Sequence, residues 1–124
     1  MNKPTIDLTD SKVLIVDDIP ENLDILSRSL EDQKYNVLVA TNGEMALEVA
    51  AQTNPDVILL DVIMPGIDGF ETCRRMKAEP ELREIPVIFL TAWNELEGLL
   101  EGFRAGGVDY ITKPFQKEEV LIRL

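Results

Sequence analysis

Histidine is absent from this chain of 124 residues, and cysteine occurs once, at position 73. Without histidine, the chain lacks the commonest general base and a frequent ligand of protein zinc sites. A single cysteine cannot form an internal disulfide. The chemistry available to the chain therefore depends on carboxylates, hydroxyls and lysines.

Basic residues and long apolar runs are also scarce. Lys and Arg number 12 against 23 Asp and Glu, so the net charge is −11, which repels nucleic-acid phosphates and anionic membranes. No apolar run approaches the roughly 18 residues of a membrane-spanning helix, and residues 1–11 contain no signal-peptide core. We therefore expect a cytoplasmic protein whose present segment binds neither nucleic acid nor membrane directly.

The length of 124 residues suits one domain with an ordinary core. Residues 1–11 are polar with isolated apolar positions, and we interpret them as a lead that precedes the folded domain, residues 12–124. The last apolar helical pattern stops in mid-period at Leu124. We expect this helix to be truncated and the natural protein to continue.

Short apolar segments alternate with segments of helical periodicity along the chain. The apolar segments lack polar alternation, as expected of strands buried on both faces. They are residues 13–16, 37–39, 57–60, 87–90 and 108–112. Pro20 suits the first turn of the first helix, and the last helix begins near Lys117. The alternation predicts an α/β fold with a doubly wound, five-stranded parallel sheet and helices on both faces.

Polar residues stand where these strands end. Asp17 and Asp18 follow the first strand, Asp61 the third, Thr91 the fourth and Lys113 the last. Open parallel sheets bind ligands at their carboxyl edge. If the first and third strands are neighbours, three carboxylates share one crevice.

Three close carboxylates repel one another unless a cation is bound. Oxygen ligands without histidine or cysteine favour Mg²⁺, and the charges of three carboxylates, one lysine and Mg²⁺ cancel. Lys113 and the Thr91 hydroxyl are groups that can hold phosphoryl oxygens. Asp61 could then attack phosphorus to give an acyl phosphate.

Four stretches closely resemble the receiver domains of two-component response regulators. They are Asp17-Asp18, Leu59 to Gly69 (LLDVIMPGIDG), Thr91-Ala92 and Tyr110 to Phe115 (YITKPF). The likeness covers nearly the whole chain from Lys12 onward. It implies a flavodoxin-like (βα)5 fold with strand order 2-1-3-4-5.

The resemblance also implies roles for the acidic residues and the lysine. Asp61 would be the phosphoacceptor, and Lys113 would bind the phosphoryl group. Mg²⁺, for which Mn²⁺ or Ca²⁺ can substitute, would be held by Asp18, Asp61 and the backbone carbonyl of Ile63, with Asp17 acting through water. Pro114, after Lys113, would follow a cis peptide bond.

Further implications concern the switch and its partners. Thr91 and Tyr110 resemble the switch pair, which would change the face formed by the fourth helix, fifth strand and fifth helix. The phosphohistidine would belong to a sensor histidine kinase or a histidine phosphotransfer protein. The domain would catalyse its own phosphorylation and dephosphorylation without being a turnover enzyme. It would regulate an output domain or effector protein, and a phosphorylation-dependent homodimer is one option.

Other functions remain alternatives at this point. A phosphohydrolase of the haloacid-dehalogenase type would resemble Asp-x-Asp at the nucleophile, whereas Ile63 stands in that second position. A flavin- or nucleotide-binding module of similar topology would need phosphate-binding glycine motifs that the chain lacks. A docking-only pseudo-receiver would not need the complete acidic set.

Simpler interpretations apply to individual residues. Asp17-Asp18 alone could just begin a helix. Cys73 has helical spacing with apolar neighbours and is interpreted as a core residue rather than a redox group. Gly98, Gly102 and Gly106 recur every four residues, and we expect them to soften their helix rather than to pack closely.

Overall fold

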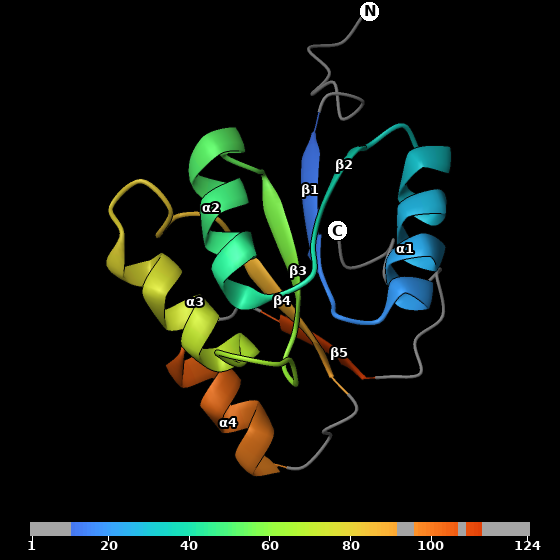
Figure 1. Ribbon diagram of the computed structural model, residues 1–124. Coiled ribbons are helices and arrows are strands. Elements are labelled where there is room, and N and C mark those ends of the chain that lie inside the picture. The colour runs from blue at the N-terminus through green and yellow to red at the C-terminus, as the bar shows by residue number, and fades with distance from the viewer. Residues whose placement is uncertain (1–10, 92–95, 107–108, 113–124) are drawn as a thin grey trace, which may run out of the picture.

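A parallel sheet of five strands forms the centre of the protein (Figure 1). The computed structural model describes residues 11–91, 96–106 and 109–112. The strands are β1 (Lys12–Val16), β2 (Asn36–Ala40), β3 (Val57–Asp61), β4 (Val87–Thr91) and β5 (Asp109–Thr112). The helices among these residues are α1 (Pro20–Asp32), α2 (Gly43–Thr53), α3 (Gly69–Ala78) and α4 (Leu96–Arg104).

The strands lie in the order β2-β1-β3-β4-β5, and each neighbouring pair is parallel. The predicted fold class and strand order are therefore confirmed. The helix expected from Lys117 lies outside the described residues. None of the described helices is long and apolar enough to span a bilayer.

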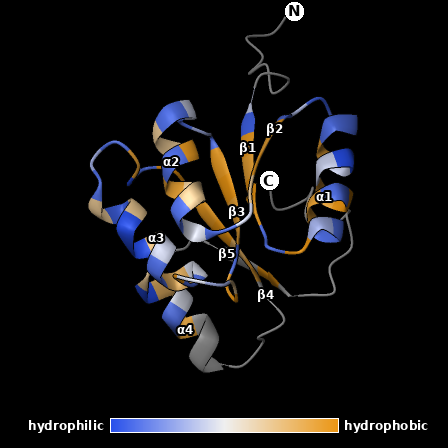
Figure 2. Ribbon diagram, viewed as in Figure 1, coloured by the Kyte–Doolittle hydropathy of each residue, from blue (hydrophilic) through white to orange (hydrophobic). Residues whose placement is uncertain are grey.

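Successive residues of each strand face opposite sides of the sheet and enter two separate cores. Leu14 and Val16 of β1 pack in the core that includes Ala46 of α2. Val13 and Ile15 pack in the core on the other side, beneath α1. Figure 1 accordingly shows α1 on one face and α2, α3 and α4 on the other, and Figure 2 shows the apolar strands between them. The uninterrupted apolar strands thus follow from burial on both faces.

Local signals set several helix ends. α1 begins at Pro20, which occupies its first position, as predicted. The side chain of Asn42 accepts a hydrogen bond from the Met45 amide at the start of α2 (2.8 Å), and α2 ends at Asn54 with a left-handed φ of 53°. Asp68 caps α3 by accepting from the Glu71 amide (2.8 Å). These caps satisfy backbone groups that the helices leave unpaired.

Two glycines, one within α4 and one just after it, have different roles. Gly106 ends the helical segment with φ 103°, which glycine adopts without a steric penalty. Gly102, however, lies so close to Phe89 that an added Cβ would be 3.2 Å from its ring. The interpretation of Gly102 as merely softening the helix was therefore wrong: its missing side chain lets α4 approach β4.

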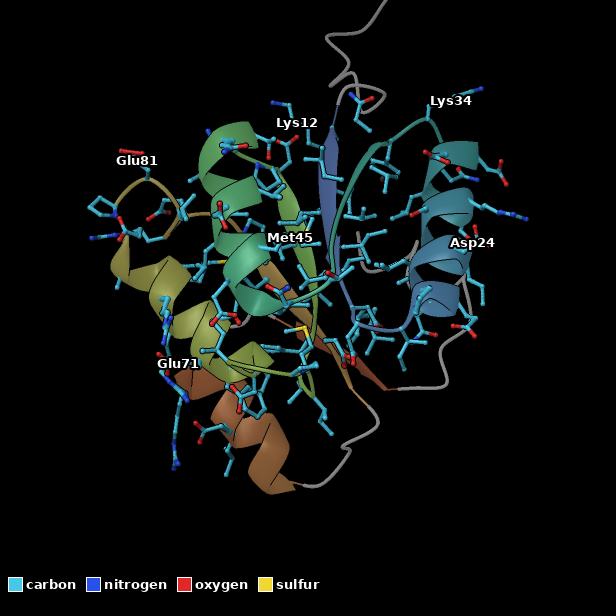
Figure 3. The ribbon with its side chains drawn as sticks, in the orientation of Figure 1. Lys12, Asp24, Lys34, Met45, Glu71 and Glu81 are labelled. Atoms are coloured by element: carbon cyan, nitrogen blue, oxygen red, sulfur yellow. The ribbon has the colours of Figure 1, made fainter. Side chains whose placement is uncertain are left out.

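Charged side chains lie on the outer helix faces (Figure 3). Asp24 pairs with Arg28 along α1 at 3.1 Å, and Glu71 pairs with Arg75 along α3 at 3.0 Å. The first pair is largely exposed and the second is about half exposed, so each contributes roughly 0–1 kcal/mol to stability. The fold thus depends on its two cores far more than on these ion pairs.

Candidate functional site

Three carboxylates meet at the carboxyl edge of the sheet. Asp17 and Asp18 directly follow β1, and Asp61 is the last residue of β3. β1 and β3 are neighbours, with Val16 opposite Leu60. One carboxylate oxygen from each Asp lies within 4.8 Å of the others. The structure therefore brings together the acidic residues that the sequence placed at separate strand ends.

The three acids differ in exposure. Asp17 is fully buried and Asp61 is 4% exposed, whereas Asp18 is exposed to solvent. Buried carboxylates at this spacing repel one another and favour a bound cation. The donor set consists of oxygen atoms on the ends of two paired strands, which fits a hard divalent ion. The cluster could hold a metal ion.

Asp17 is also held by the segment that enters α1. Its Oδ1 accepts a hydrogen bond from the Ile19 amide at 2.9 Å, and its Oδ2 accepts from Asn22 Nδ2 at 3.1 Å. The sequence analysis did not single out Asn22. Its position five residues after Asp17, in the first turn of a helix that begins at Pro20, was the available signal.

The segment after Asp61 is fixed by the start of α3. The Gly69 amide donates to the Val62 carbonyl at 2.8 Å, and a Cβ on Gly69 would overlap the carbonyl oxygen of Asp61. Val62 and Met64 point into the core, whereas Ile63 between them is 68% exposed. The Val62 amide also donates to the Leu90 carbonyl of β4 at 3.2 Å, so the backbone of residues 61 and 62 is held from both the sheet and the helix.

The remaining predicted site residues belong to β4, β5 and the segment beyond. Thr91 is the last residue of β4 and lies opposite Thr112, so the chain leaves both strands at the same edge as Asp61. Tyr110 lies in β5 opposite Phe89. The side chains of Thr91 and Tyr110, and the whole of Lys113 and Pro114, lie outside what the structure describes. The backbone thus places Thr91 at this edge, and its role stays a prediction.

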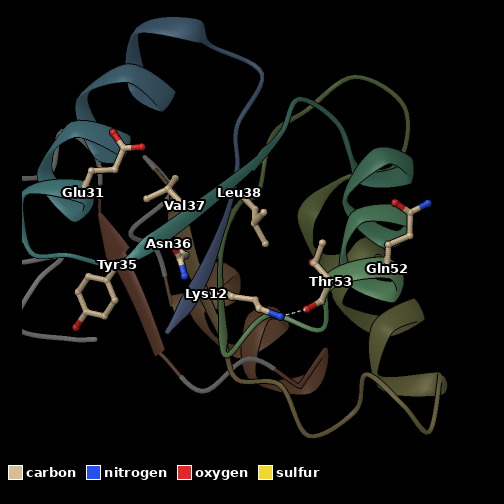
Figure 4. A pocket seen from close by; sticks show the side chains of 8 residues that line it. All are labelled: Lys12, Glu31, Tyr35, Asn36, Val37, Leu38, Gln52 and Thr53. Carbon is tan, nitrogen blue, oxygen red and sulfur yellow. Dashed lines mark hydrogen bonds between the residues drawn. The ribbon is translucent and has the colours of Figure 1, made fainter. Parts of the chain in front are cut away.

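A cavity of about 520 Å³ lies at the other end of β1 (Figure 4). Lys12, the first residue of β1, lines it, and its Nζ donates to the Thr53 carbonyl at 2.8 Å. Because Asp17 and Asp18 follow the last residue of the same strand, this cavity is separate from the acidic cluster.

Comparison with known proteins agrees with the fold. The family model described as the response regulator receiver domain matches residues 13–124. The chain belongs to the response regulator receiver domain family.

Three similar proteins illustrate the family. The DNA-binding dual master transcriptional regulator RpaA of Synechocystis sp. is 40% identical over 91% of this chain and 47% of its own length. Response regulator PleD of Caulobacter vibrioides is 40% identical over 92% of this chain and 25% of its own length. The structure of chemotaxis protein CheY4 of Vibrio cholerae has a TM-score of 0.89 at 33% identity, covering 92% of this chain and 95% of that one. The chain thus spans less than half the length of RpaA and of PleD.

Proposed function

We propose that this domain is a phosphoacceptor switch that takes a phosphoryl group from a partner's phosphohistidine onto Asp61. The observation that carries the proposal is the convergence of Asp17, Asp18 and Asp61 at one edge of the sheet, in a member of the receiver family. Because Asp61 is almost buried at the end of β3, its carboxylate has a defined position from which to attack.

The metal we propose is Mg²⁺, with Mn²⁺ or Ca²⁺ as substitutes. Asp18, Asp61 and the Ile63 carbonyl would hold it directly, and Asp17 would act through water. When bound, the ion offsets the charge of the carboxylates and of the incoming phosphoryl oxygens. Asp18 is the exposed member of the cluster, so an ion arriving from solvent would meet its carboxylate before those of Asp17 and Asp61.

In the transfer step, an Asp61 carboxylate oxygen attacks phosphorus as the P–N bond to the partner's imidazole breaks. The bonding electron pair stays on the imidazole nitrogen, and Asp61 becomes an aspartyl phosphate. Lys113 would pair with the phosphoryl oxygens, and the Thr91 hydroxyl would donate to them. Hydrolysis of the acyl phosphate by water would return Asp61 to its starting state.

Phosphorylation would be read out through Thr91 and Tyr110. Thr91 would move toward the phosphoryl group, and Tyr110 would fill the space that it leaves. The face formed by α4, β5 and the segment after β5 would change as a result. In this proposal the domain is a switch without substrate turnover beyond its own phosphate.

The proposed partners follow from this role. A sensor histidine kinase or a histidine phosphotransfer protein would donate the phosphoryl group. An output domain or effector protein would read the changed face, and a phosphorylation-dependent homodimer is one form that reading could take. The 12 basic against 23 acidic residues argue against direct nucleic-acid contact by this domain.

Acetyl phosphate provides the test, because a small phosphodonor removes the need to know the kinase. The protein is incubated with acetyl phosphate and Mg²⁺, and its intact mass is measured. We expect the mass of one added phosphoryl group in the wild type and none in Asp61→Asn or with EDTA. Asp24→Asn, the same change at an exposed acid of α1, is the matched control and should be phosphorylated normally. Equal phosphorylation of Asp61→Asn would refute the proposal.

A further inference from the structure

Asn22 lies beside the acidic cluster without belonging to it. It sits in the first turn of α1, where its backbone amide donates to the Ile19 carbonyl at 3.1 Å. Its side-chain Nδ2 donates to Asp17 Oδ2 at 3.1 Å. The side-chain amide of Asn22 therefore links α1 to the residue that follows β1.

With the bond from Asn22, both oxygens of the Asp17 carboxylate accept a hydrogen bond. The Ile19 amide donates to Oδ1 and Asn22 donates to Oδ2, so each oxygen has its own donor. A carboxylate held at both oxygens cannot turn about its Cβ–Cγ bond without breaking a hydrogen bond. Each oxygen can accept more than one hydrogen bond, and an Asp17 oxygen still lies within 4.8 Å of the carboxylates of Asp18 and Asp61.

The chemistry of the donor also matters. An amide donates to a carboxylate without adding charge, so the cluster keeps its negative charge and its attraction for a cation. A lysine or arginine in this place would offset that charge and compete with a metal ion. Asn22 is only half-buried, so it can reach Asp17 without a large desolvation cost of its own.

We infer that Asn22 is a positioning residue that fixes the orientation of Asp17 toward a divalent cation shared with Asp18 and Asp61. The inference rests on the metal site of the proposed function. Groups that hydrogen-bond to metal-binding side chains orient them, and their loss typically weakens metal binding by about 10–100-fold. Because Asp17 would act through water, we expect the lower end of that range.

A purely structural role for Asn22 predicts something different. Ile19, the N-cap residue of α1, makes no side-chain cap bond, so the contacts of Asp17 could serve only to begin the helix. In that case, losing the Asn22 amide would lower the stability of the metal-free protein and leave the metal affinity of the folded protein unchanged.

Calorimetric titration with MgCl₂ separates the two roles. It compares the wild type with Asn22→Ala, with Asn22→Leu, which keeps a similar volume but no donor, and with Asn36→Ala as the control at an exposed position of β2. Melting temperatures are measured in EDTA. We expect the Mg²⁺ Kd to rise about tenfold in both Asn22 variants. Asn36→Ala should keep the wild-type Kd, and all variants should melt within a few degrees of the wild type in EDTA.

The outcomes distinguish this inference from the proposed function. If the wild type binds Mg²⁺ and both Asn22 variants bind it with the wild-type Kd, the positioning role is refuted while the metal site stands. A lowered melting temperature in EDTA with an unchanged Kd would likewise assign Asn22 a structural role only. If the wild type does not bind Mg²⁺, the metal site itself is refuted.

Discussion

The aspartates at the carboxyl edge place negative charges close together. Two unit charges about 4 Å apart repel by about 1 kcal/mol in water and by about 4 kcal/mol at the effective dielectric near a protein surface. Asp17 and Asp61 are buried, so water screens this repulsion less than it would at the surface. We infer that this repulsion lowers the stability of the metal-free domain, and that a cation bound at the proposed site would relieve it.

Asp18→Asn tests this balance at a single residue. Removing the Asp18 charge should raise the melting temperature in EDTA, because the repulsion of Asp18 from Asp17 and from Asp61 is lost. The same change should weaken Mg²⁺ binding by at least about tenfold, because the proposed direct ligand loses its charge. Thermal melts with and without Mg²⁺ measure both effects, and Asp24→Asn serves as the control on α1. A lower melting temperature in EDTA would contradict the repulsion argument.

Cys73 is a buried residue whose ionisation is affected by its surroundings. Burial raises the pKa of its thiol from 9.0 to about 11, and the nearby charges of Lys77 and Arg74 lower this pKa only in part. Its Sγ donates to the Ala105 carbonyl at 3.2 Å within the core. The thiol is therefore protonated and shielded at neutral pH, as expected of a core residue.

This raised pKa predicts a loss of stability in alkali. Between pH 9 and 11 the unfolded chain releases the thiol proton while the folded protein keeps it, so the free energy of unfolding falls as pH rises. From about pH 8 to about pH 10.5 the wild type should lose about 2 kcal/mol more than Cys73→Ala. Urea unfolding of both proteins at the two pH values measures the difference. Parallel losses in the two proteins would show that the thiol ionises equally in both states.

At the scale of elements, the junction between β3 and α3 fixes the backbone next to the proposed phosphoacceptor. Gly69 begins α3 in contact with the Asp61 carbonyl, where no side chain fits. Gly69→Ala should force the helix away from β3 and lower the free energy of unfolding by about 1–3 kcal/mol. It should also slow phosphorylation by acetyl phosphate, because the backbone of Asp61 and Val62 must move to make room for the new methyl group. Wild-type stability and phosphorylation rate together would contradict this account of the junction.

Thr91→Ala tests the coupling between β4 and the face formed by α4 and β5. If Thr91 transmits the signal, the variant should still accept phosphate on Asp61, but the amide chemical shifts of α4 and β5 should respond much less than in the wild type. Thr53→Ala, at the far end of α2, is the control and should respond normally. A full response in Thr91→Ala would remove Thr91 from the switch.

The sequence predicted the fold at this scale because several independent signals agreed. Uninterrupted apolar strands indicated burial on both faces, and Pro20 marked a helix start that the structure confirms. The close approach of Gly102 to Phe89 was not predicted, because nothing in a four-residue glycine repeat says which aromatic ring it will meet.

The site was predictable only in part, because sequence patterns indicate where strands end but not which side chains of other elements contact them. Asp17, Asp18 and Asp61 stand at strand ends, so sheet topology alone brings them together. Asn22 acts through a side chain that reaches from a helix to a neighbouring loop, and no periodic pattern encodes such a reach. The roles of Thr91, Tyr110 and Lys113 remain predictions.

At the scale of the whole molecule, the domain combines two packed cores with a charged edge. The cores on the two faces of the sheet hold β1 and β3 in register, and that register sets the distances among the carboxylates. The net charge of −11 favours cations at the edge and disfavours polyanions over the surface. Fold stability and proposed function thus depend on the same sheet.

The position of the phosphoryl group tests the central claim most directly. Protein treated with acetyl phosphate and Mg²⁺ is reduced with borohydride, which converts an aspartyl phosphate to homoserine, and its peptides are then analysed by mass spectrometry. The account predicts homoserine at position 61 and unchanged aspartate at positions 17, 18 and 68. Homoserine at any of those other positions, with Asp61 intact, would contradict it.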